Sequence, residues 1–335
     1  MIKVPSYITN WDMPPGTLEQ TYPILAIDAE TVSLENKLVL GIGISWDGVH
    51  GVYFLNPRDP RLIALINRTD QVVVQNGSFD IPELRKMGCP VPDFDDTMLM
   101  ARAAGILEAS LEALSASVLG RECPSVTDQW DKDDKGRLKQ HANIGIDHEF
   151  MGQICIIHAC NTMALHKTIP KTELYETIDK PFLDLVIEME SWGLLIDQWI
   201  LTQVEHSEAV QANQLRMELY MDMGVINFSS TKQVAEALRA KGIIGTRKTK
   251  SDKMSTSSDS LKGLDNPITN RLLKWRSKKK TLSTYIPAFR NVDERGRLHT
   301  HFGYATTGRL RSYSEGGKGT NLQNITKDSK FKEDE

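Results

Sequence analysis

The sequence is poor in cysteine, and its four cysteines show no spacing typical of a metal site or a disulfide framework. They stand at positions 89, 123, 155 and 160 of 335 residues and include no CxxC pair. A zinc site held by cysteines is therefore not expected, and the thiols suit a reducing compartment as buried or incidental side chains.

Long apolar runs are also lacking. No segment approaches the roughly 20 apolar residues that cross a bilayer, so no membrane is expected as a partner. The N-terminal sequence MIKVPSYITNWDMPPG lacks the basic start, apolar centre and small-residue cleavage site of a secretory signal. The sequence therefore favours a cytoplasmic protein.

No charge of one sign is in large excess. Lys and Arg number 40 against 44 Asp and Glu, a formal charge of -4, which argues against a uniformly basic nucleic-acid-binding protein. The distribution is uneven, however, because residues 247–280 contain eleven Lys or Arg against three Asp and no Glu. This stretch is either a solvated helix face beside a loop or a nucleic-acid-binding surface.

The first third of the chain alternates apolar runs with turn residues and predicts an α/β fold. The runs YPILAID, KLVLGIGISW, GVYFLN and QVVVQN read as strands, with helical stretches between or after them. A helix is expected from near Ile146 to about Lys167, and helical periodicity dominates residues 198–223 and 268–285. The length favours two packed units, with a boundary near Pro170, which breaks a helical pattern.

Two carboxylates, Asp28 and Glu30, stand at the end of the first apolar run. Because strand side chains alternate, both point to one face of the sheet and can share a metal ion. Asp80 follows the strand QVVVQ, where that strand gives way to a helix. Each motif alone has a plainer reading, as charges at a strand end or as a helix cap.

Together, the two acidic clusters have the arrangement that holds two divalent ions around a phosphodiester. Such ions help to generate hydroxide and stabilise charge on the phosphate and the leaving 3′ oxygen. We therefore expect two Mg²⁺ or Mn²⁺ ions, with Asp28, Glu30 and Asp80 as ligands.

The pattern D-x-E followed by N-x-x-F-D, residues 76–80, resembles the first two motifs of the DEDD exonuclease superfamily. The segments DDTMLMAR, SLEAL and LG that follow are similar to helices of polymerase-linked members. The resemblance implies a ribonuclease H-like mixed sheet with flanking helices and 3′→5′ exonuclease activity. It also implies that Asn76 and Phe79 contact a single-stranded 3′ end of DNA.

The third motif departs from the family. Tyrosine-type members carry Tyr-x-x-x-Asp on a helix, where the aspartate is the fourth metal carboxylate and the tyrosine positions water. In the register that fits downstream residues, Ile154 stands at the tyrosine and His158 at the aspartate. A second register places His158 at the tyrosine and Thr162 at the aspartate. The histidine-type branch is not matched either, since Met163 stands where its aspartate is expected.

The fourth carboxylate is absent in either register, so we expect weakened exonuclease activity with His158 as a catalytic candidate. A neutral imidazole ligates Mn²⁺ or Zn²⁺ better than Mg²⁺. The alternative is that His158 is a partly buried histidine with satisfied hydrogen bonds in a decayed site.

Later segments resemble family A DNA polymerases. EMESWGLLID, residues 188–197, is similar to the start of their polymerase region, and NFSSTKQV, residues 227–234, to the stretch before a short thumb helix. The basic loop then resembles the thumb tip that grips primer-template duplex. Phosphate contacts of this kind, which set affinity more than sequence choice, are implied for Arg247, Lys248, Lys250 and Lys253.

The segments ATTGRL, residues 305–310, and NLQNI, residues 321–325, resemble the T-G-R-L and N-L-Q-N signature of the family's palm. The resemblance implies primer-template contacts for Arg309, Asn321 and Gln323. Residues 313–320 between these segments exceed the family spacing.

The resemblance covers residues 22–325 and implies three domains. These are an exonuclease domain over residues 1–170, a helical thumb region over 171–290 and the start of a palm over 291–335. The palm aspartate, the fingers lysine and the later His-Asp-Glu motif do not occur in the sequence, so this chain alone is not expected to polymerise DNA. A split gene, with palm and fingers on a second polypeptide as partner, would explain this, and so would a truncation or an interrupted reading frame.

No 5′-nuclease domain precedes Asp28, which favours a phage-type enzyme acting in the host cytoplasm. One alternative is a non-catalytic DNA-binding and assembly subunit. Another is a stand-alone DEDD ribonuclease, which the palm-like signature argues against.

Overall fold

The structure is a computed structural model that describes residues 7–9, 16, 19–33, 37–91, 93–129, 143, 146–245, 254–305, 308–314 and 319–324. Contacts divide the chain into two compact units. The first comprises Met1–Trp192, Phe302–Leu310 and Glu315–Gly317, and the second Gly193–His301, Arg311–Ser314 and Lys318–Glu335. Each unit is described by itself below.

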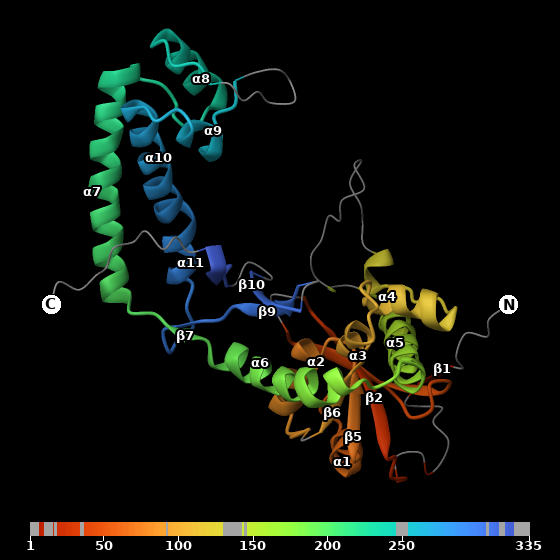
Figure 1. The fold of residues 1–335 in the computed structure, drawn as a ribbon. Helices are drawn as coiled ribbons and strands as arrows, with labels where there is room; N and C mark the ends of the chain where they lie inside the picture. The colour runs from red at the N-terminus through yellow and green to blue at the C-terminus, as the bar shows by residue number, and fades with distance from the viewer. Residues whose placement is uncertain are drawn as a thin grey trace. The chain divides into compact units, whose positions relative to one another are not determined.

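The first unit contains a six-stranded mixed sheet with the order β1-β4-β3-β2-β5-β6 (Figure 1). Its strands are β1 (Tyr7–Thr9), β2 (Ile24–Thr31), β3 (Val39–Ser45), β4 (Gly51–Phe54), β5 (Gln71–Val74) and β6 (Phe94–Asp96). β2 pairs antiparallel with β3 and parallel with β5, and β5 pairs parallel with β6. The predicted α/β class is confirmed.

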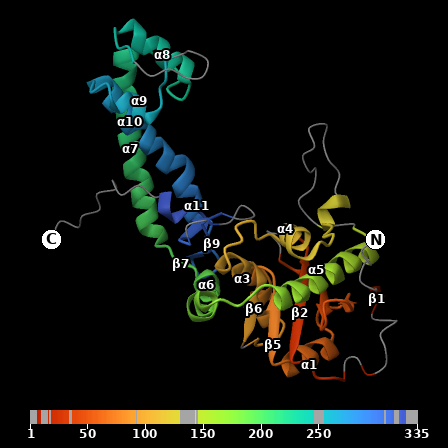
Figure 2. The ribbon, with the colours of Figure 1, turned by 45° about the vertical axis from the view of Figure 1, so that its right-hand side comes forward.

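Helices cover both faces of this sheet. They are α1 (Pro60–Arg68), α2 (Gly77–Lys86), α3 (Thr97–Ala103), α4 (Leu111–Leu114), α5 (His148–Thr168) and α6 (Lys180–Trp192), with helical turns at Ser115–Leu119, Val126–Gln129 and Tyr175–Asp179. α5 contacts β2, β3 and β4 and runs across the sheet (Figure 2). The predicted helix near 146–167 corresponds to α5.

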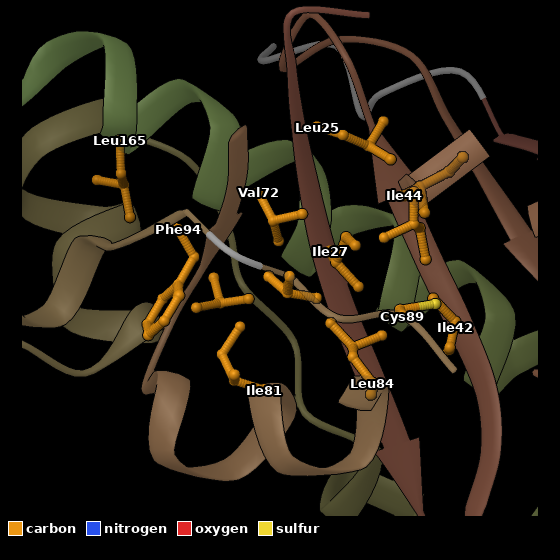
Figure 3. Packing of buried hydrophobic residues seen from close by; sticks show 14 of the residues in the cluster. Leu25, Ile27, Ile42, Ile44, Val72, Ile81, Leu84, Cys89, Phe94 and Leu165 are labelled. Atoms are coloured by element: carbon orange, nitrogen blue, oxygen red, sulfur yellow. The ribbon is translucent and has the colours of Figure 1, made fainter. Parts of the chain in front are cut away.

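Alternation along β2 determines which residues meet which helices. Leu25 and Ile27 belong to the main core, with Ile81 and Leu84 of α2 (Figure 3). Ala26, between them, packs with Met163 of α5. The next residues of the same register, Asp28 and Glu30, therefore share the face that α5 covers.

A glycine in β3 allows α5 to lie close to the sheet. A Cβ atom at Gly43 would lie only 2.5 Å from the carbonyl oxygen of Cys155 in α5. The Gly43 amide donates a hydrogen bond to the Cys155 sulfur at 3.1 Å. This close approach sets the position of α5, and with it the position of His158, one turn further along.

Residues beyond Pro170 complete the core of the first unit. Tyr175, Leu183 and Ile187 are buried within the same hydrophobic cluster as the strands. The first segment of this unit thus ends at Trp192. The division into an exonuclease domain, a thumb region and a palm fragment at residues 170 and 290 stays a prediction.

The second unit is mainly helical. It contains α7 (Gln198–Met223), α8 (Thr231–Ala240), α9 (Ser258–Lys262), α10 (Pro267–Lys280), a helical turn at Thr281–Tyr285, α11 (Ile286–Arg290) and the paired strands β7 (Leu194–Leu195) and β8 (Arg297–Leu298). α7 and α10 lie side by side (Figures 1 and 2). Their core includes Leu219, Leu272 and Trp275.

The last elements are two short strands and a helical turn. β9 (His301–Tyr304) and β10 (Leu310–Tyr313) pair with each other, and a turn follows at Leu322–Asn324. In the part of the chain that is described, no helix has the length and apolar composition that spanning a membrane requires.

Candidate metal centre

Three potential metal ligands meet where β2 lies under α5. The carboxylate oxygens of Asp28 and Glu30 and a ring nitrogen of His158 all lie within 4.8 Å of one another. The strand supplies the two carboxylates through alternation, and the helix supplies the imidazole. Asp147 caps α5, since its carboxylate accepts a hydrogen bond from the Phe150 amide at 3.1 Å.

Asp80 brings a third carboxylate to the same place. It lies in the first turn of α2, is 4% exposed, and accepts a hydrogen bond from the Ala29 amide at 3.2 Å. That amide stands between Asp28 and Glu30 in the chain. The three acidic residues singled out from the sequence therefore converge.

The carboxylates of the cluster lie close enough to repel one another. Burial, followed by the charge of Asp28, raises the pKa of Glu30 to about 8. Burial and Asp28 also raise the pKa of Asp80 well above its ordinary value. Carboxyl groups in this setting favour either protonation or a bound cation.

His158 is the basic member of this cluster. Its Nδ1 lies 3.5 Å from Oδ2 of Asp28, and its Nε2 lies 2.8 Å from the carbonyl oxygen of Pro124. Burial lowers the pKa of the imidazole, but the Asp28 carboxylate and the Cys123 side chain together outweigh this effect and raise the pKa well above the ordinary value.

The other residues of the third motif are buried. Ile154 is 2% exposed and packs with Val126, Ile146 and Met151. Thr162 is 1% exposed. Cys155, next to Ile154, donates its thiol hydrogen to the Asp28 carbonyl oxygen at 3.2 Å.

Asp96 supports the site but was not singled out from the sequence. Its carboxylate accepts hydrogen bonds from the amides of Gly77 at 2.7 Å and Asn76 at 3.2 Å, just before Asp80. It also caps α3 by accepting from the Met98 amide at 2.8 Å. Its place at the end of β6 and before a helix is the signal that could have indicated this role.

The predicted DNA-contacting residues of the first unit lie at or near the surface. Asn76 is exposed and has a positive φ of 68° at the start of α2. Phe79 is half-buried, with the Lys37 amino group 5.1 Å from its ring centroid. Arg309 is exposed and follows Gly308, whose φ is 76°.

Among the remaining predicted contacts, Asn321 accepts a hydrogen bond from the Gln323 amide at 3.0 Å. Arg247, Lys248, Lys250 and Lys253 lie outside the described residues.

A second acidic centre in the first unit is neutralised by the protein itself. Asp95 is fully buried and accepts from Tyr175 at 3.0 Å, with His166 at 2.8 Å, Lys171 at 2.5 Å and Lys180 at 3.1 Å around it. Burial alone would raise the pKa of Asp95, but the hydrogen bonds from His166 and the two lysines lower it far below the ordinary value.

Comparison with known proteins identifies the class to which much of this chain is related. Residues 199–334 match the profile of the family described as DNA polymerase family A. The chain is also similar to proteins named DNA polymerase I. The one from Rhizobium leguminosarum is 31% identical over 286 residues, which are 79% of this chain and 27% of that protein.

Two further relatives are also named DNA polymerase I. The thermostable DNA polymerase I of Thermus thermophilus is 34% identical over 162 residues, covering 45% of this chain and 19% of the relative. DNA polymerase I of Borreliella burgdorferi is 27% identical over 330 residues, 90% of this chain and 35% of the relative. The chain thus spans a minor part of the length of these relatives.

A solved structure shares the fold. It is described as the POL domain of Pol1 from M. smegmatis in complex with DNA primer-template and dNTP, with a TM-score of 0.65 and 21% identity over 91% of this chain and 52% of that one. The predicted relation to family A DNA polymerases is confirmed. The exonuclease and phage-type interpretations stay predictions.

Proposed function

We propose that the first unit is a ribonuclease H-like 3′→5′ exonuclease domain joined to the thumb and the start of the palm of a family A DNA polymerase. It removes 3′-terminal nucleotides from DNA, at a rate weakened by the changes in the third motif. The observation that carries this proposal is the convergence of Asp28, Glu30 and Asp80 from β2 and α2.

The residues present fit divalent ions. Asp28, Glu30 and Asp80 supply hard oxygen ligands, and Oδ2 of Asp28 is a buried atom without a hydrogen-bond partner. Mg²⁺ or Mn²⁺ bound there would supply hydroxide and stabilise negative charge on the phosphate.

The chain itself positions these groups and the nucleic acid. Asp96 holds the start of α2, and the Ala29 amide orients Asp80, so the carboxylates are fixed before substrate binds. Phe79, half-buried beside Asn76, offers a ring face on which a terminal base can stack. Ile154 has no polar group to orient water, which is the physical reason for a lower rate.

The second unit, together with Arg309 of the first unit, extends the proposal to duplex DNA. Its match to DNA polymerase family A supports a thumb and palm role. We assign phosphate and minor-groove contacts to Arg247, Lys248, Lys250 and Lys253, and primer-template contacts to Arg309, Asn321 and Gln323. A second polypeptide that carries palm and fingers would complete a polymerase. We also propose that the enzyme is of the phage type.

A second candidate function is a non-catalytic DNA-binding and assembly unit. The observations that favour it are the burial of Ile154 and the position of His158, which offsets the charge of Asp28. A stand-alone ribonuclease is disfavoured, because residues 199–334 match a polymerase family.

Hydrolysis of labelled nucleic acid separates these functions. The purified chain is incubated with Mg²⁺ or Mn²⁺ and single strands labelled at the 5′ end, as DNA and as RNA. Stepwise shortening of DNA that is lost in Asp28→Asn but kept in Glu112→Gln, an exposed carboxylate on α4, supports the nuclease. Duplex binding without shortening favours the assembly unit, and preference for RNA favours the ribonuclease.

A further inference from the structure

The orientation of His158 is fixed by its hydrogen bond to a backbone carbonyl. A carbonyl oxygen only accepts, so the contact of 2.8 Å with Pro124 places the ring hydrogen on Nε2. A metal ion bound at Nδ1 would replace the hydrogen that the protonated ring directs toward Asp28. Histidines that ligate metals commonly donate their other ring N–H to a backbone carbonyl or a carboxylate in this way.

The distance between His158 and Asp28 is longer than that of a strong direct hydrogen bond. Nδ1 and Oδ2 are 3.5 Å apart, whereas a charge-assisted N–H···O bond measures about 2.7–2.9 Å. The His166 and Asp95 pair in the same unit shows such a bond, at 2.8 Å. Nδ1 of His158 and Oδ2 of Asp28 are therefore further apart than the directly bonded atoms of His166 and Asp95.

The wider spacing suits a metal ion bound by both atoms. With metal–ligand lengths of about 2.0–2.2 Å, two ligand atoms lie roughly 3.4 Å apart at a tetrahedral angle and roughly 3.0 Å apart at an octahedral right angle. The observed 3.5 Å is close to the tetrahedral value, and an octahedral ion such as Mn²⁺ would draw the two atoms about 0.5 Å closer. Oδ2 of Asp28 is buried and accepts no hydrogen bond, and no described residue donates one to the Glu30 carboxylate.

We infer that His158 is a metal ligand through Nδ1, and that with Asp28 and Glu30 it forms a site that takes a divalent transition-metal ion such as Mn²⁺ in preference to Mg²⁺. The inference deepens the proposed function, since it concerns the same site. Imidazole is a common ligand of transition-metal ions, most of all Zn²⁺, and Mn²⁺ also accepts it, whereas Mg²⁺ is held mainly by oxygen ligands. His158, which stands where related sites have a fourth carboxylate, thereby changes the metal ion that the site prefers.

The first test needs no substitution. The full chain is loaded with Mn²⁺, and pulsed electron paramagnetic resonance is used to detect coupling of the ion to a ¹⁴N nucleus. Calorimetry then compares Mn²⁺ with Mg²⁺. We expect nitrogen coupling and at least tenfold tighter binding of Mn²⁺. Bound Mn²⁺ without nitrogen coupling, or equal affinity for the two ions, would overturn the inference.

Substitutions at position 158 provide the second test. His158→Ala should lose the nitrogen coupling and weaken Mn²⁺ binding by at least about tenfold, given that even the partners of ligating residues contribute about 10–100-fold to affinity. His158→Asp should shift the preference toward Mg²⁺ by a similar factor. His148→Ala is the matched control, because His148 is an exposed histidine on the same helix, and should leave both readouts unchanged.

Metal binding and hydrolysis are scored separately. Mn²⁺ bound through His158 in a chain that leaves DNA intact supports the inference and contradicts the nuclease. DNA shortening with Mn²⁺ that is equally fast in His158→Ala supports the nuclease and contradicts the inference. Failure of the wild-type chain to bind Mn²⁺ contradicts it as well.

Discussion

The first unit holds both the buried carboxylate of Asp95 and the carboxylate cluster of Asp28, Glu30 and Asp80. The two centres differ in how their negative charge is compensated. Asp95 has two lysines, a histidine and a tyrosine around it. Asp28, Glu30 and Asp80 have one histidine among them. Accordingly, the pKa of Asp95 lies below its ordinary value and those of Glu30 and Asp80 above theirs.

This difference separates a structural carboxylate from a functional one. A buried charge that is fully paired adds rigidity and leaves no capacity to bind an ion. A cluster of like charges held together by the fold is unfavourable without a partner, and such sites are candidates for chemistry. The first unit contains one fully paired carboxylate, Asp95, and one cluster of like charges, which we propose as the metal centre.

Substitution of Asp95 should have the largest effect on stability. Asp95→Asn removes the fully buried charge that pairs with His166 and Lys171 and leaves Lys180 with Asp93 alone, so we expect the free energy of unfolding to fall by about 3–5 kcal/mol. Urea denaturation followed by circular dichroism measures this. A loss below about 1 kcal/mol would mean that the network is not important for folding.

Gly43→Ala should have the second-largest effect on stability. Of the two centres, it should disturb only the cluster of Asp28, Glu30 and Asp80. The added Cβ would collide with the backbone of Cys155, so α5 must move, at a cost of about 1–3 kcal/mol. We also expect weaker binding of Mn²⁺, because His158 moves with α5. Gly263→Ala is the control, since a Cβ there meets only ordinary contacts. Equal effects of the two substitutions would contradict the close packing of α5 on β3.

Lowering the pH should reduce the contribution of Asp95 to the free energy of unfolding, by less than either substitution does. Since the folded pKa of Asp95 is lowered, its contribution is present above the unfolded value near 3.8 and is lost as the pH falls toward the folded pKa. We expect a loss of about 1 kcal/mol between pH 5 and pH 3 from this group. Urea melts at several pH values should show that Asp95→Asn lacks this part of the acid dependence, and identical curves would refute it.

Neutralising Glu30 should change stability least. Glu30→Gln keeps the shape but removes one of the repelling charges, so in the presence of EDTA we expect the free energy of unfolding to stay the same or rise by up to about 1 kcal/mol. The same urea measurement applies. A loss comparable to that of Asp95→Asn would erase the distinction between the two centres.

Local patterns predicted much of the first unit. Alternation in the first apolar run assigned Asp28 and Glu30 to one face, and the change from strand to helix marked Asp80. The run QVVVQN corresponds to β5, and the helix expected from near Ile146 corresponds to α5. These signals are short-range, so a single sequence carries them.

Contacts between distant segments were not predictable in this way. The hydrogen bond from His158 reaches a backbone carbonyl 34 residues away, and any residue type can supply a carbonyl. The partners of Asp95 come from α5, α6 and the segment between them. The packing of Tyr175 and Ile187 in the first unit depends on tertiary contacts that the break at Pro170 does not reveal.

Anomalous diffraction from crystals of the chain soaked with Mn²⁺ tests the account most directly. An anomalous peak between the carboxylates of Asp28 and Glu30 and Nδ1 of His158, with no peak at Asp95, is the predicted result. Absence of a peak beside Asp28 while Mn²⁺ binds elsewhere would contradict the assignment of the metal centre.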